Sequence, residues 1–501
     1  MDVSVSVSVS ELVTWFTAHN GIFDRSALTF AQIDGLGWGA LALRDLQQGH
    51  TLFSIPRHLT LSTRTSSLPS LIGEADWKRH GLHIGWSGLI LCLMWEAAQG
   101  SSSRWSTYLA SLPITFNTPM FWSSEDVEQL RGTAIIERIG REQAENDYLN
   151  KVVPLLKNRT DYFGDEHANL HYSLEAYHIM GSRILSRSFQ VEAWSATYNV
   201  DTSQTPPHED PEMSLDKHSP QALDDNSSDE DEDKDSDDGE NDDPANVAMV
   251  PLADMLNARY DCENAKLFYE EHFLRMATTR SIRRGEQIWN TYGDPPNSDL
   301  LRRYGHVDQV PLPCGGSGNP ADIVEIRADL VMSSVGAKCL QQASPRSSER
   351  IDWWLEEGGD DIFVVDFSAE LPEELTSFVR LLMMSDPEWA KTKRKSKLPK
   401  PKVDDAVLSV VADVLRRRLA EYPTTIEDDE ALLGTEKEKP IPLNVKNAVV
   451  VRLSEKRILG NLQRAVTTRL GGDPSESKSS VSSRKRKADG TDADGHRAAK
   501  R

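Results

Sequence analysis

Two patterns of apolar residues divide the chain. Between residues 28 and 53, short apolar runs alternate with glycine-rich turns, which predicts strands at Ala40–Leu46 and Thr51–Ile55. Over His58–Met180, and again after residue 318, apolar residues recur every three or four positions, the period of an amphipathic helix. The predicted helices are Glu11–Asn20, Ser87–Glu96, Ser123–Leu130, Ile135–Tyr148, Leu174–Ser188, Leu371–Met384, Asp404–Glu421 and Asn444–Leu470.

Polar stretches interrupt these patterns at three places. Thr202–Ala245 has few apolar residues and many acidic ones, so we expect a disordered surface loop. Pro311–Gly318 is rich in proline and glycine and is expected to be a linker. The charged, serine-rich tail Asp473–Arg501 is also expected to be disordered. Its basic run Arg484–Lys487, followed by a second basic cluster, favours a bipartite nuclear import signal over a nonspecific basic tail.

Charge and cysteine content narrow the classes of protein to consider. The formal net charge is -22, but the acidic stretch between residues 224 and 243 holds thirteen acids and one lysine. The rest of the chain is therefore close to ordinary, and we expect no direct contact with nucleic acid. The four cysteines show no C-x-x-C spacing, so no metal site is predicted. The chain also lacks an apolar run of about 18 residues and the basic and apolar regions of a signal peptide, so neither a membrane span nor a leader is expected.

A glycine cluster follows the first predicted strand. Three glycines between residues 35 and 39 let the backbone approach another group closely, although a tight turn alone also explains them. The dinucleotide-binding fingerprint is excluded, because the G-x-G-x-x-G spacing is absent and the next segment is predicted as a strand.

Two arginines share one face of the helix predicted at Leu174–Ser188. Arg183 and Arg187 are four residues apart, which places them one turn from each other. A solvated helix face is one interpretation. Because apolar residues flank the pair, half-buried arginines with anionic or carbonyl partners are the other.

The strand-rich stretch Val250–Asp308 carries tyrosine, asparagine and arginine in its turns. It contains no Ser-His-Asp order, no H-E-x-x-H and no Walker loop. His272 and His306 lack a matching nucleophile, so hydrolysis is poorly supported. Tyr292 and Tyr304 each precede a glycine, and a pocket lined by tyrosines suits a cation or an amine.

Five motifs follow one another along the chain: Gly37-Trp38-Gly39, Asp254-Met255-Leu256-Asn257, Gly285-Glu286-Gln287, Asn290-Thr291-Tyr292-Gly293 and Leu300-Leu301-Arg302-Arg303-Tyr304-Gly305. Each motif is moderately specific, but their order and spacing together resemble those of SET-domain protein-lysine methyltransferases. The resemblance is narrower to the Rubisco large-subunit methyltransferase class, and within it to the group of the fungal ribosomal lysine N-methyltransferase 4 and SET domain-containing protein 6.

The resemblance implies an α+β fold. In that fold a β-rich SET domain is split by the helical insert His58–Met180 and followed by an all-α substrate-binding domain. The implied domains are an N-terminal segment at 1–23, the SET domain at 24–308 with the acidic loop 202–245 inside it, the helical domain at 319–471 and the tail at 472–501.

The resemblance also implies S-adenosylmethionine as the methyl donor and Tyr292 as the catalytic residue. The residues implied to bind this cofactor are Gly37, Trp38, Gly39, Arg183, Asn257, Ala258 and Tyr304. The residues implied to lie near the substrate are Arg187, Asp254, Tyr292 and Tyr304. Many members of the class have histidine where this chain has Ala258, so the side-chain contact of that histidine is lost while its backbone contacts can be kept.

The implied activity is methylation of a protein lysine, with a large-subunit ribosomal protein as the implied substrate. Acidic stretches of the chain are compatible with a basic protein partner. Two alternatives stay open: methylation of a histone or another nuclear protein, and a non-catalytic module that grips a partner with its helical domain. We expect a monomer located in the nucleus, with the cytoplasm as a second location.

Overall fold

The computed structural model describes residues 8–164, 171–193, 243–312, 315–338, 346–437 and 439–471. The chain divides into two compact units. Unit 1 consists of Met1–Leu130, Ile135–Ala321 and Ile441–Val451, and unit 2 consists of Arg131–Ala134, Asp322–Pro440 and Arg452–Arg501. The predicted tail and all but the last three residues of the predicted acidic loop lie outside the described residues.

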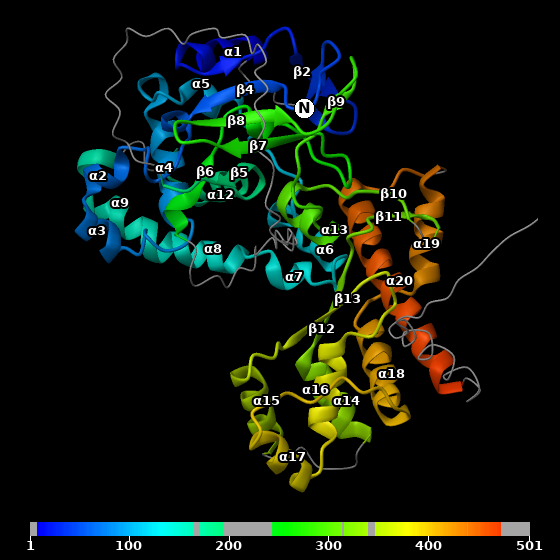
Figure 1. The fold of residues 1–501 in the computed structure, drawn as a ribbon. Coiled ribbons are helices and arrows are strands. Elements are labelled where there is room, and N and C mark those ends of the chain that lie inside the picture. Colours follow the sequence, from blue (N-terminus) through cyan, green and yellow to red (C-terminus); the bar gives the residue numbers. More distant parts are fainter. Residues whose placement is uncertain are drawn as a thin grey trace, which may run out of the picture. The chain divides into compact units, whose positions relative to one another are not determined.

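Antiparallel strands form the centre of unit 1 (Figure 1). A four-stranded sheet has the order β1 (Ile22–Phe23), β4 (Thr51–Pro56), β8 (Phe273–Thr278) and β7 (Ala265–Tyr269). A three-stranded sheet has the order β2 (Leu28–Ile33), β3 (Gly37–Ala42) and β9 (Gln287–Ile288), and β5 (Ser188–Gln190) pairs with β6 (Val247–Met249). Segments more than 200 residues apart in sequence therefore meet in the same sheets.

The glycine cluster belongs to a strand as well as to a turn, which corrects the predicted boundary. β3 already begins at Gly37, which pairs with Ile33, and Gly39 pairs with Ala31. Gly35 and Gly37 both have φ above +70°, which glycine adopts at little cost, so the chain reverses within three residues. The strand predicted at Ala40–Leu46 starts and ends earlier, because the turn is shorter than expected.

Helices surround these strands in unit 1. In chain order they are α1 (Val9–Ala18), α2 (Leu68–Ile72), α3 (Glu74–Arg79), α4 (Ser87–Ala98), α5 (Ser106–Ser111), α6 (Ser124–Glu128), α7 (Ile135–Arg138), α8 (Arg141–Asp147), α9 (Val153–Asn158), α10 (Thr160–Phe163), α12 (Leu174–Arg187) and α13 (Asn297–Asp299). The single helix predicted at Ile135–Tyr148 is two helices, because Gly140 takes a left-handed φ of 72° between α7 and α8. The predicted helix at Leu174–Ser188 is confirmed by α12.

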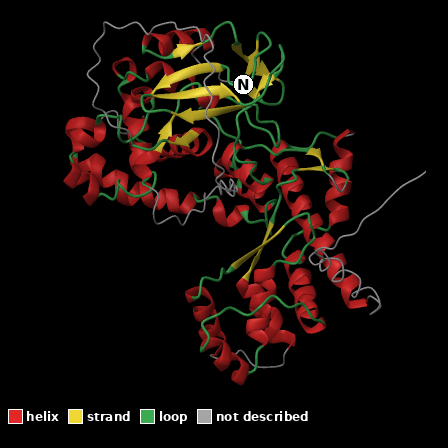
Figure 2. Ribbon diagram, in the orientation of Figure 1, coloured by secondary structure: helices red, strands yellow, loops and turns green. Residues whose placement is uncertain are grey.

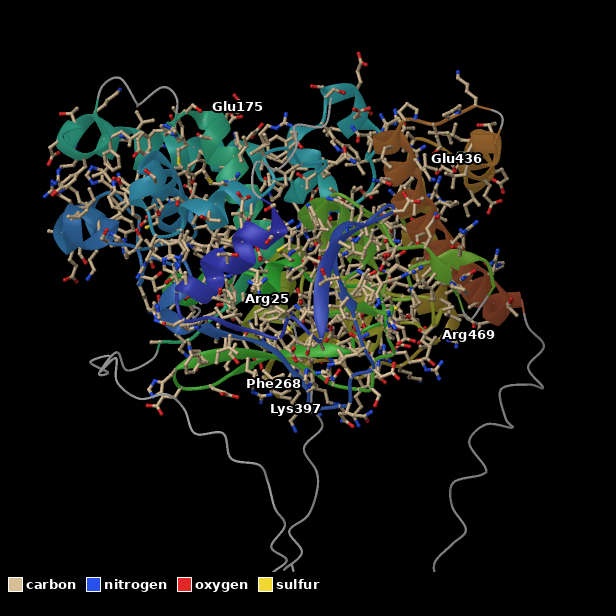
Figure 3. The ribbon with its side chains drawn as sticks, turned by 90° about the horizontal axis from the view of Figure 1, so that it is seen from above. Arg25, Glu175, Phe268, Lys397, Glu436 and Arg469 are labelled. Carbon is tan, nitrogen blue, oxygen red and sulfur yellow. The ribbon has the colours of Figure 1, made fainter. Side chains whose placement is uncertain are left out.

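Local chemistry explains where α1 begins and which side it buries. The Ser8 side chain accepts a hydrogen bond from the main-chain N–H of Glu11, and the Glu11 side chain accepts one from the main-chain N–H of Ser8. Together these bonds form a capping box. Leu12, Trp15 and Phe16 then point into the core, each less than 10% exposed. Burial of such side chains stabilises a fold by about 1.5–3 kcal/mol each. Outside the core, Glu175 and Phe268 mark exposed positions of unit 1 (Figure 3).

Unit 2 is helical, as predicted, but it also contains a ribbon of two strands that the sequence pattern did not predict (Figure 2). β12 (Val324–Arg327) pairs antiparallel with β13 (Ile362–Val365). Its helices are α14 (Ala328–Lys338), α15 (Arg346–Glu356), α16 (Glu373–Met383), α17 (Asp386–Lys393), α18 (Asp405–Leu419), α19 (Ile426–Gly434) and the part of α20 (Leu443–Gly471) that follows residue 451.

The predicted linker Pro311–Gly318 also contains strands. β10 (Val310–Pro311) and β11 (Ser317–Gly318) pair antiparallel within unit 1. Two-residue strands are too short for an alternating pattern to show in sequence. Among the helices of the described chain, none combines the length and apolar character that a membrane crossing requires.

Candidate active site

The predicted site residues meet after β6, at a strained turn. Leu252 adopts a left-handed φ of 70°, an uncommon conformation for a residue other than glycine. The short 3-10 turn Ala253–Met255 follows and leads to Asn257. Strain of this kind concentrates at functional sites, and here it places Asp254 in the interior, with a side chain only 1% exposed.

Tyr292 and Tyr304 stack against each other beside this turn. Their ring centroids are 4.4 Å apart and their planes differ by 11°. The Tyr292 hydroxyl donates a hydrogen bond of 3.3 Å to the carbonyl oxygen of Leu256. Burial, with a smaller contribution from Tyr304, raises the pKa of Tyr292 well above its usual value, so the hydroxyl is neutral at physiological pH. Tyr292 is therefore equipped to donate and accept hydrogen bonds rather than to act as a phenolate base.

A π-helical turn sets the position of Tyr304. This turn spans Leu300–Tyr304 and ends at Gly305, which has a φ of 78°. A Cβ atom at Gly305 would lie 2.8 Å from the carbonyl oxygen of Asn117, so only glycine allows this close approach. The predicted motif from residue 300 to 305 thus has a direct structural reason for its final glycine.

Asp254 is held by groups from two helices. The hydroxyl of Tyr108, in α5, donates to Oδ2 at 2.9 Å, and Arg187, in α12, donates to the main-chain oxygen of Asp254 at 2.6 Å. The same guanidinium lies 3.7 Å from Oδ2. Oδ1 is buried and has no hydrogen-bond partner among the described residues. Burial raises the pKa of Asp254 to about 6, although Arg187 and Tyr108 oppose this shift.

Asn257 lies against the glycine strand. A Cβ atom on Gly39 would be 2.7 Å from Asn257 Nδ2 and 2.9 Å from Gln287 Nε2. Both amide nitrogens are buried, and neither has a partner within the part of the chain that the structure describes. The main-chain oxygen of Asn257 accepts a hydrogen bond of 2.9 Å from Asn290. Buried donors without partners are costly, so this pair of amides suits a bound group that carries acceptor oxygens.

The two arginines of α12 have different partners. Arg183 is 5% exposed, and its guanidinium donates to the carbonyl oxygens of Pro113 at 2.9 Å and Leu112 at 3.5 Å. Burial lowers the pKa of Arg183 to about 10. The interpretation of half-buried arginines is therefore right, and that of a solvated face is wrong for Arg183. Arg187 is the arginine that reaches Asp254, so the contacts give no support to the implied cofactor role of Arg183.

The remaining predicted residues are Gly37, Trp38 and Ala258. Gly37 is exposed at the hairpin, and Trp38 is partly buried and packs on the core of unit 1. Ala258 and Tyr292 line a narrow pocket of about 10 Å³, roughly the space of one water molecule. Asp308, which also lines this pocket, was not predicted.

Sequence reasoning also missed two residues nearer the centre. Tyr108 belongs to none of the motifs, and Gln287 was predicted only as part of a motif. Tyr108 and its partner Asp254 are 146 positions apart, a distance at which a hydrogen bond leaves no local pattern. Within the described residues, no group of three side chains of the metal-binding types is close enough to hold a metal ion.

The sequence of this chain matches a protein-family model and several known proteins. A family model described as Rubisco LSMT substrate-binding matches residues 339–459. Ribosomal lysine N-methyltransferase 4 of Saccharomyces cerevisiae is 30% identical over 278 residues, and the match spans 55% of this chain and 50% of the yeast protein. N-lysine methyltransferase SETD6 of Rattus norvegicus is 26% identical over 485 residues, 91% of this chain and 90% of the rat protein.

Solved structures confirm the predicted α+β fold. The crystal structure of the SET domain of LSMT bound to lysine and AdoHcy has a TM-score of 0.60 and 17% identity to this chain. The match covers 92% of this chain and 91% of that structure. At this level of identity the likeness concerns the fold, and the chemistry has to be argued from the residues of the site.

Proposed function

We propose that this chain, which belongs to the SET-domain protein-lysine methyltransferases of the Rubisco large-subunit methyltransferase class, methylates a lysine side chain of a protein with S-adenosylmethionine as the methyl donor. One observation carries this proposal. The stacked Tyr292 and Tyr304 lie beside a buried turn in which Asp254 Oδ1 and the Asn257 amide nitrogen have no hydrogen-bond partner among the described residues. The aligned part covers 50% of the yeast relative, so the proposed activity rests on the residues of this site.

The donor set fits the proposed cofactor. S-adenosylmethionine, when bound, supplies an electrophilic methyl group on a positively charged sulfur and also carries a carboxylate. The buried amides of Asn257 and Gln287 offer donors for acceptor oxygens, and the absence of a side chain on Gly39 keeps the backbone close to them. Neutral tyrosine rings stabilise a neighbouring cation through their faces. Solved LSMT, which shares this fold, is bound to AdoHcy and lysine.

The residues of the site then prepare the substrate amine. A lysine amine has a pKa of about 10.4 in water and must lose its proton before it can attack. A buried pocket disfavours the charged form of the amine and so lowers its pKa. The neutral hydroxyl of Tyr292 orients the amine, because it can accept or donate a hydrogen bond. Holding the amine in line with the methyl group accounts for most of the rate enhancement.

The proposed substrate is a large-subunit ribosomal protein. The name of the yeast relative supports a ribosomal substrate, and the acidic composition of this chain supports a basic one. The SETD6 relatives are named only as N-lysine methyltransferases, which keeps histones and other nuclear proteins as the second candidate class.

A labelling experiment tests the activity and the substrate together. The full chain is incubated with methyl-labelled S-adenosylmethionine and either purified ribosomal subunits or core histones, with the Tyr292→Phe variant in parallel. We expect label on one large-subunit protein, lost in the variant. Label only on histones would contradict the ribosomal substrate and favour a histone substrate. Absence of label on both, despite measured cofactor binding, would contradict the enzyme and favour a binding module.

A nuclear location is part of this proposal and rests on the two basic clusters of the tail. Deletion of residues 484–501 from a fluorescent fusion should shift the signal from nucleus to cytoplasm. A matched variant that keeps length but replaces Arg484–Lys487 with alanines should do the same. A distribution unchanged by either alteration would contradict the import signal.

A further inference from the structure

Tyr108 is almost fully buried, although its side chain carries a polar hydroxyl group. It lies in α5 of the helical insert and is 1% exposed. Its ring stacks on Trp15 of α1, with centroids 6.1 Å apart and planes differing by 11°. The Trp15 indole in turn donates to the carbonyl oxygen of Arg104 at 2.8 Å. Phenylalanine would fill this space equally well, so packing does not explain the hydroxyl.

The hydroxyl has one task that the structure shows. It donates to Oδ2 of Asp254 at 2.9 Å. Burial raises the pKa of Tyr108 well above its usual value, so it stays a donor across the physiological range. Hydrogen bonds to an ionised acceptor are about twice as strong as those between neutral groups. The bond therefore favours the carboxylate form of Asp254.

The bond also selects which carboxylate oxygen is left open. The titratable and charged groups around Asp254 are Tyr108 from α5, Arg187 and Arg183 from α12, and Tyr292. Tyr108 and Arg187 both act on the Oδ2 side, while Oδ1 has no partner of normal hydrogen-bond geometry in the described chain. The main-chain N–H groups of Leu252 and Asp254 also lie close to the carboxylate and favour its ionised form. In a site that receives an amine, an open carboxylate oxygen is a ready acceptor for its N–H groups.

We propose that Tyr108 is a positioning residue of the methyltransferase site, which fixes the carboxylate of Asp254 so that Oδ1 is available to the substrate amine. The proposal rests on the proposed function. It assigns to the helical insert a direct part in the site, because Tyr108 and the helix α1 that stacks on it hold a residue of the Asp254–Asn257 turn.

The test is Tyr108→Phe, assayed for methyl transfer between pH 6 and pH 9.5. Loss of the donor raises the pKa of Asp254, so its carboxylate is protonated at a higher pH than in the native protein. We expect the acidic limb of the pH profile to move up by about one unit, which lowers kcat/KM about fivefold at pH 6 and about twofold at pH 7 and leaves it nearly unchanged at pH 9.

Tyr148→Phe is the matched control. It also removes a hydroxyl from the insert, one that donates to the carbonyl oxygen of Tyr172 at 2.7 Å. We expect it to lower the melting temperature slightly and to leave the pH profile in place. If Tyr108→Phe lowers activity by the same factor at every pH, Tyr108 has only a structural role and the proposal is overturned.

A double-mutant cycle keeps the test decisive if Tyr108→Phe folds poorly. Asp254→Asn removes the titrating group, so adding Tyr108→Phe should cause little further loss of kcat/KM. Fully additive losses would overturn the proposal. Failure of the proposed function looks different, because native protein would then transfer no methyl group at any pH while still folding.

Discussion

Each unit brings together a buried tyrosine, a buried carboxylate and an arginine, yet the two trios differ in which atoms they leave without partners. In unit 1, Tyr108 donates to Asp254 and Arg187 lies 3.7 Å from the carboxylate. In unit 2, Tyr422 donates to Glu455 at 2.5 Å, and Arg418 also lies 3.7 Å from its carboxylate. Burial raises the pKa of both acids, to about 6 for Asp254 and about 8 for Glu455.

The surroundings of the two trios separate a site from a structural core. Arg418 also donates to main-chain oxygens of Glu325 and Gly132, so the unit 2 trio ties backbone segments of that unit together. Beside the unit 1 trio, Asp254, Asn257 and Gln287 each keep a buried atom without a partner among the described residues. A carboxylate with a raised pKa therefore does not by itself mark an active site. The buried atoms without partners beside Asp254 are what distinguish the proposed site from the unit 2 trio.

The largest change in stability is expected at Asp429, which lies next to the unit 2 trio. Asp429 pairs with Arg452 at 2.7 Å and Lys456 at 2.5 Å, and all three side chains are at most 2% exposed. Asp429→Asn leaves two cations poorly compensated, so we expect a loss of about 3–5 kcal/mol in the free energy of unfolding. Urea unfolding followed by circular dichroism measures it.

Glu430→Gln is the control for this change. Glu430 follows Asp429 in α19 and pairs with Arg457 at 2.7 Å, but this pair is largely exposed. Such pairs contribute about 0–1 kcal/mol. Equal losses in Asp429→Asn and Glu430→Gln would show that the buried cluster is not a stabilising centre.

A second effect is expected at the glycine strand. A Cβ atom in Gly39→Ala would press on the Asn257 amide at 2.7 Å and on Ile33 at 2.5 Å. We expect S-adenosylmethionine affinity, measured by titration calorimetry, to fall about tenfold, since a lost or displaced hydrogen bond to a charged group is worth about 1.5–3 kcal/mol. Gly336→Ala is the control, because nothing lies within 4 Å of its added Cβ. Equal affinities in the two variants would remove Gly39 from the site.

A third contrast is a pH dependence of stability from the unit 2 trio. Burial raises the pKa of Glu455 from 4.5 to about 8, so the folded state keeps a proton that the unfolded state releases. Stability is therefore fully present below pH 4.5 and is lost as the pH rises toward 8. Glu455→Gln should reduce this fall, measured by urea unfolding at pH 6 and pH 8.5. An equally steep fall in the variant would assign it to other groups.

The sequence predicted the elements with strong periodicity and the order of the motifs. α12, α16, α18 and α20 lie close to their predicted bounds, because each repeats apolar residues over several turns. The ribbon of β12 and β13 was missed because its strands have four residues each and meet across more than 30 intervening positions. Gly140 interrupts a helix without interrupting the apolar period, so the pattern alone did not divide α7 from α8.

The site was predictable as far as motifs reach. Asp254, Asn257, Tyr292 and Tyr304 are brought together as the motif order implied. The contacts of Arg183 and Arg187 were not predictable, because both occupy the same helix face. Only the packed structure shows that Arg183 donates to carbonyl oxygens of the insert and Arg187 to that of Asp254. Tyr108 and Gln287 needed three-dimensional contacts, since their partners are remote in sequence.

Tyr292→Phe tests the central claim most directly, because it removes one hydroxyl and leaves the stacked ring in place. Methyl transfer and S-adenosylmethionine binding are measured on the same preparation, with Tyr148→Phe beside it. The account predicts a fall in kcat of about 100-fold or more, which corresponds to about 2.7 kcal/mol of lost transition-state stabilisation, with cofactor affinity preserved. Full turnover in Tyr292→Phe would contradict the assignment of this site as the methyltransferase centre.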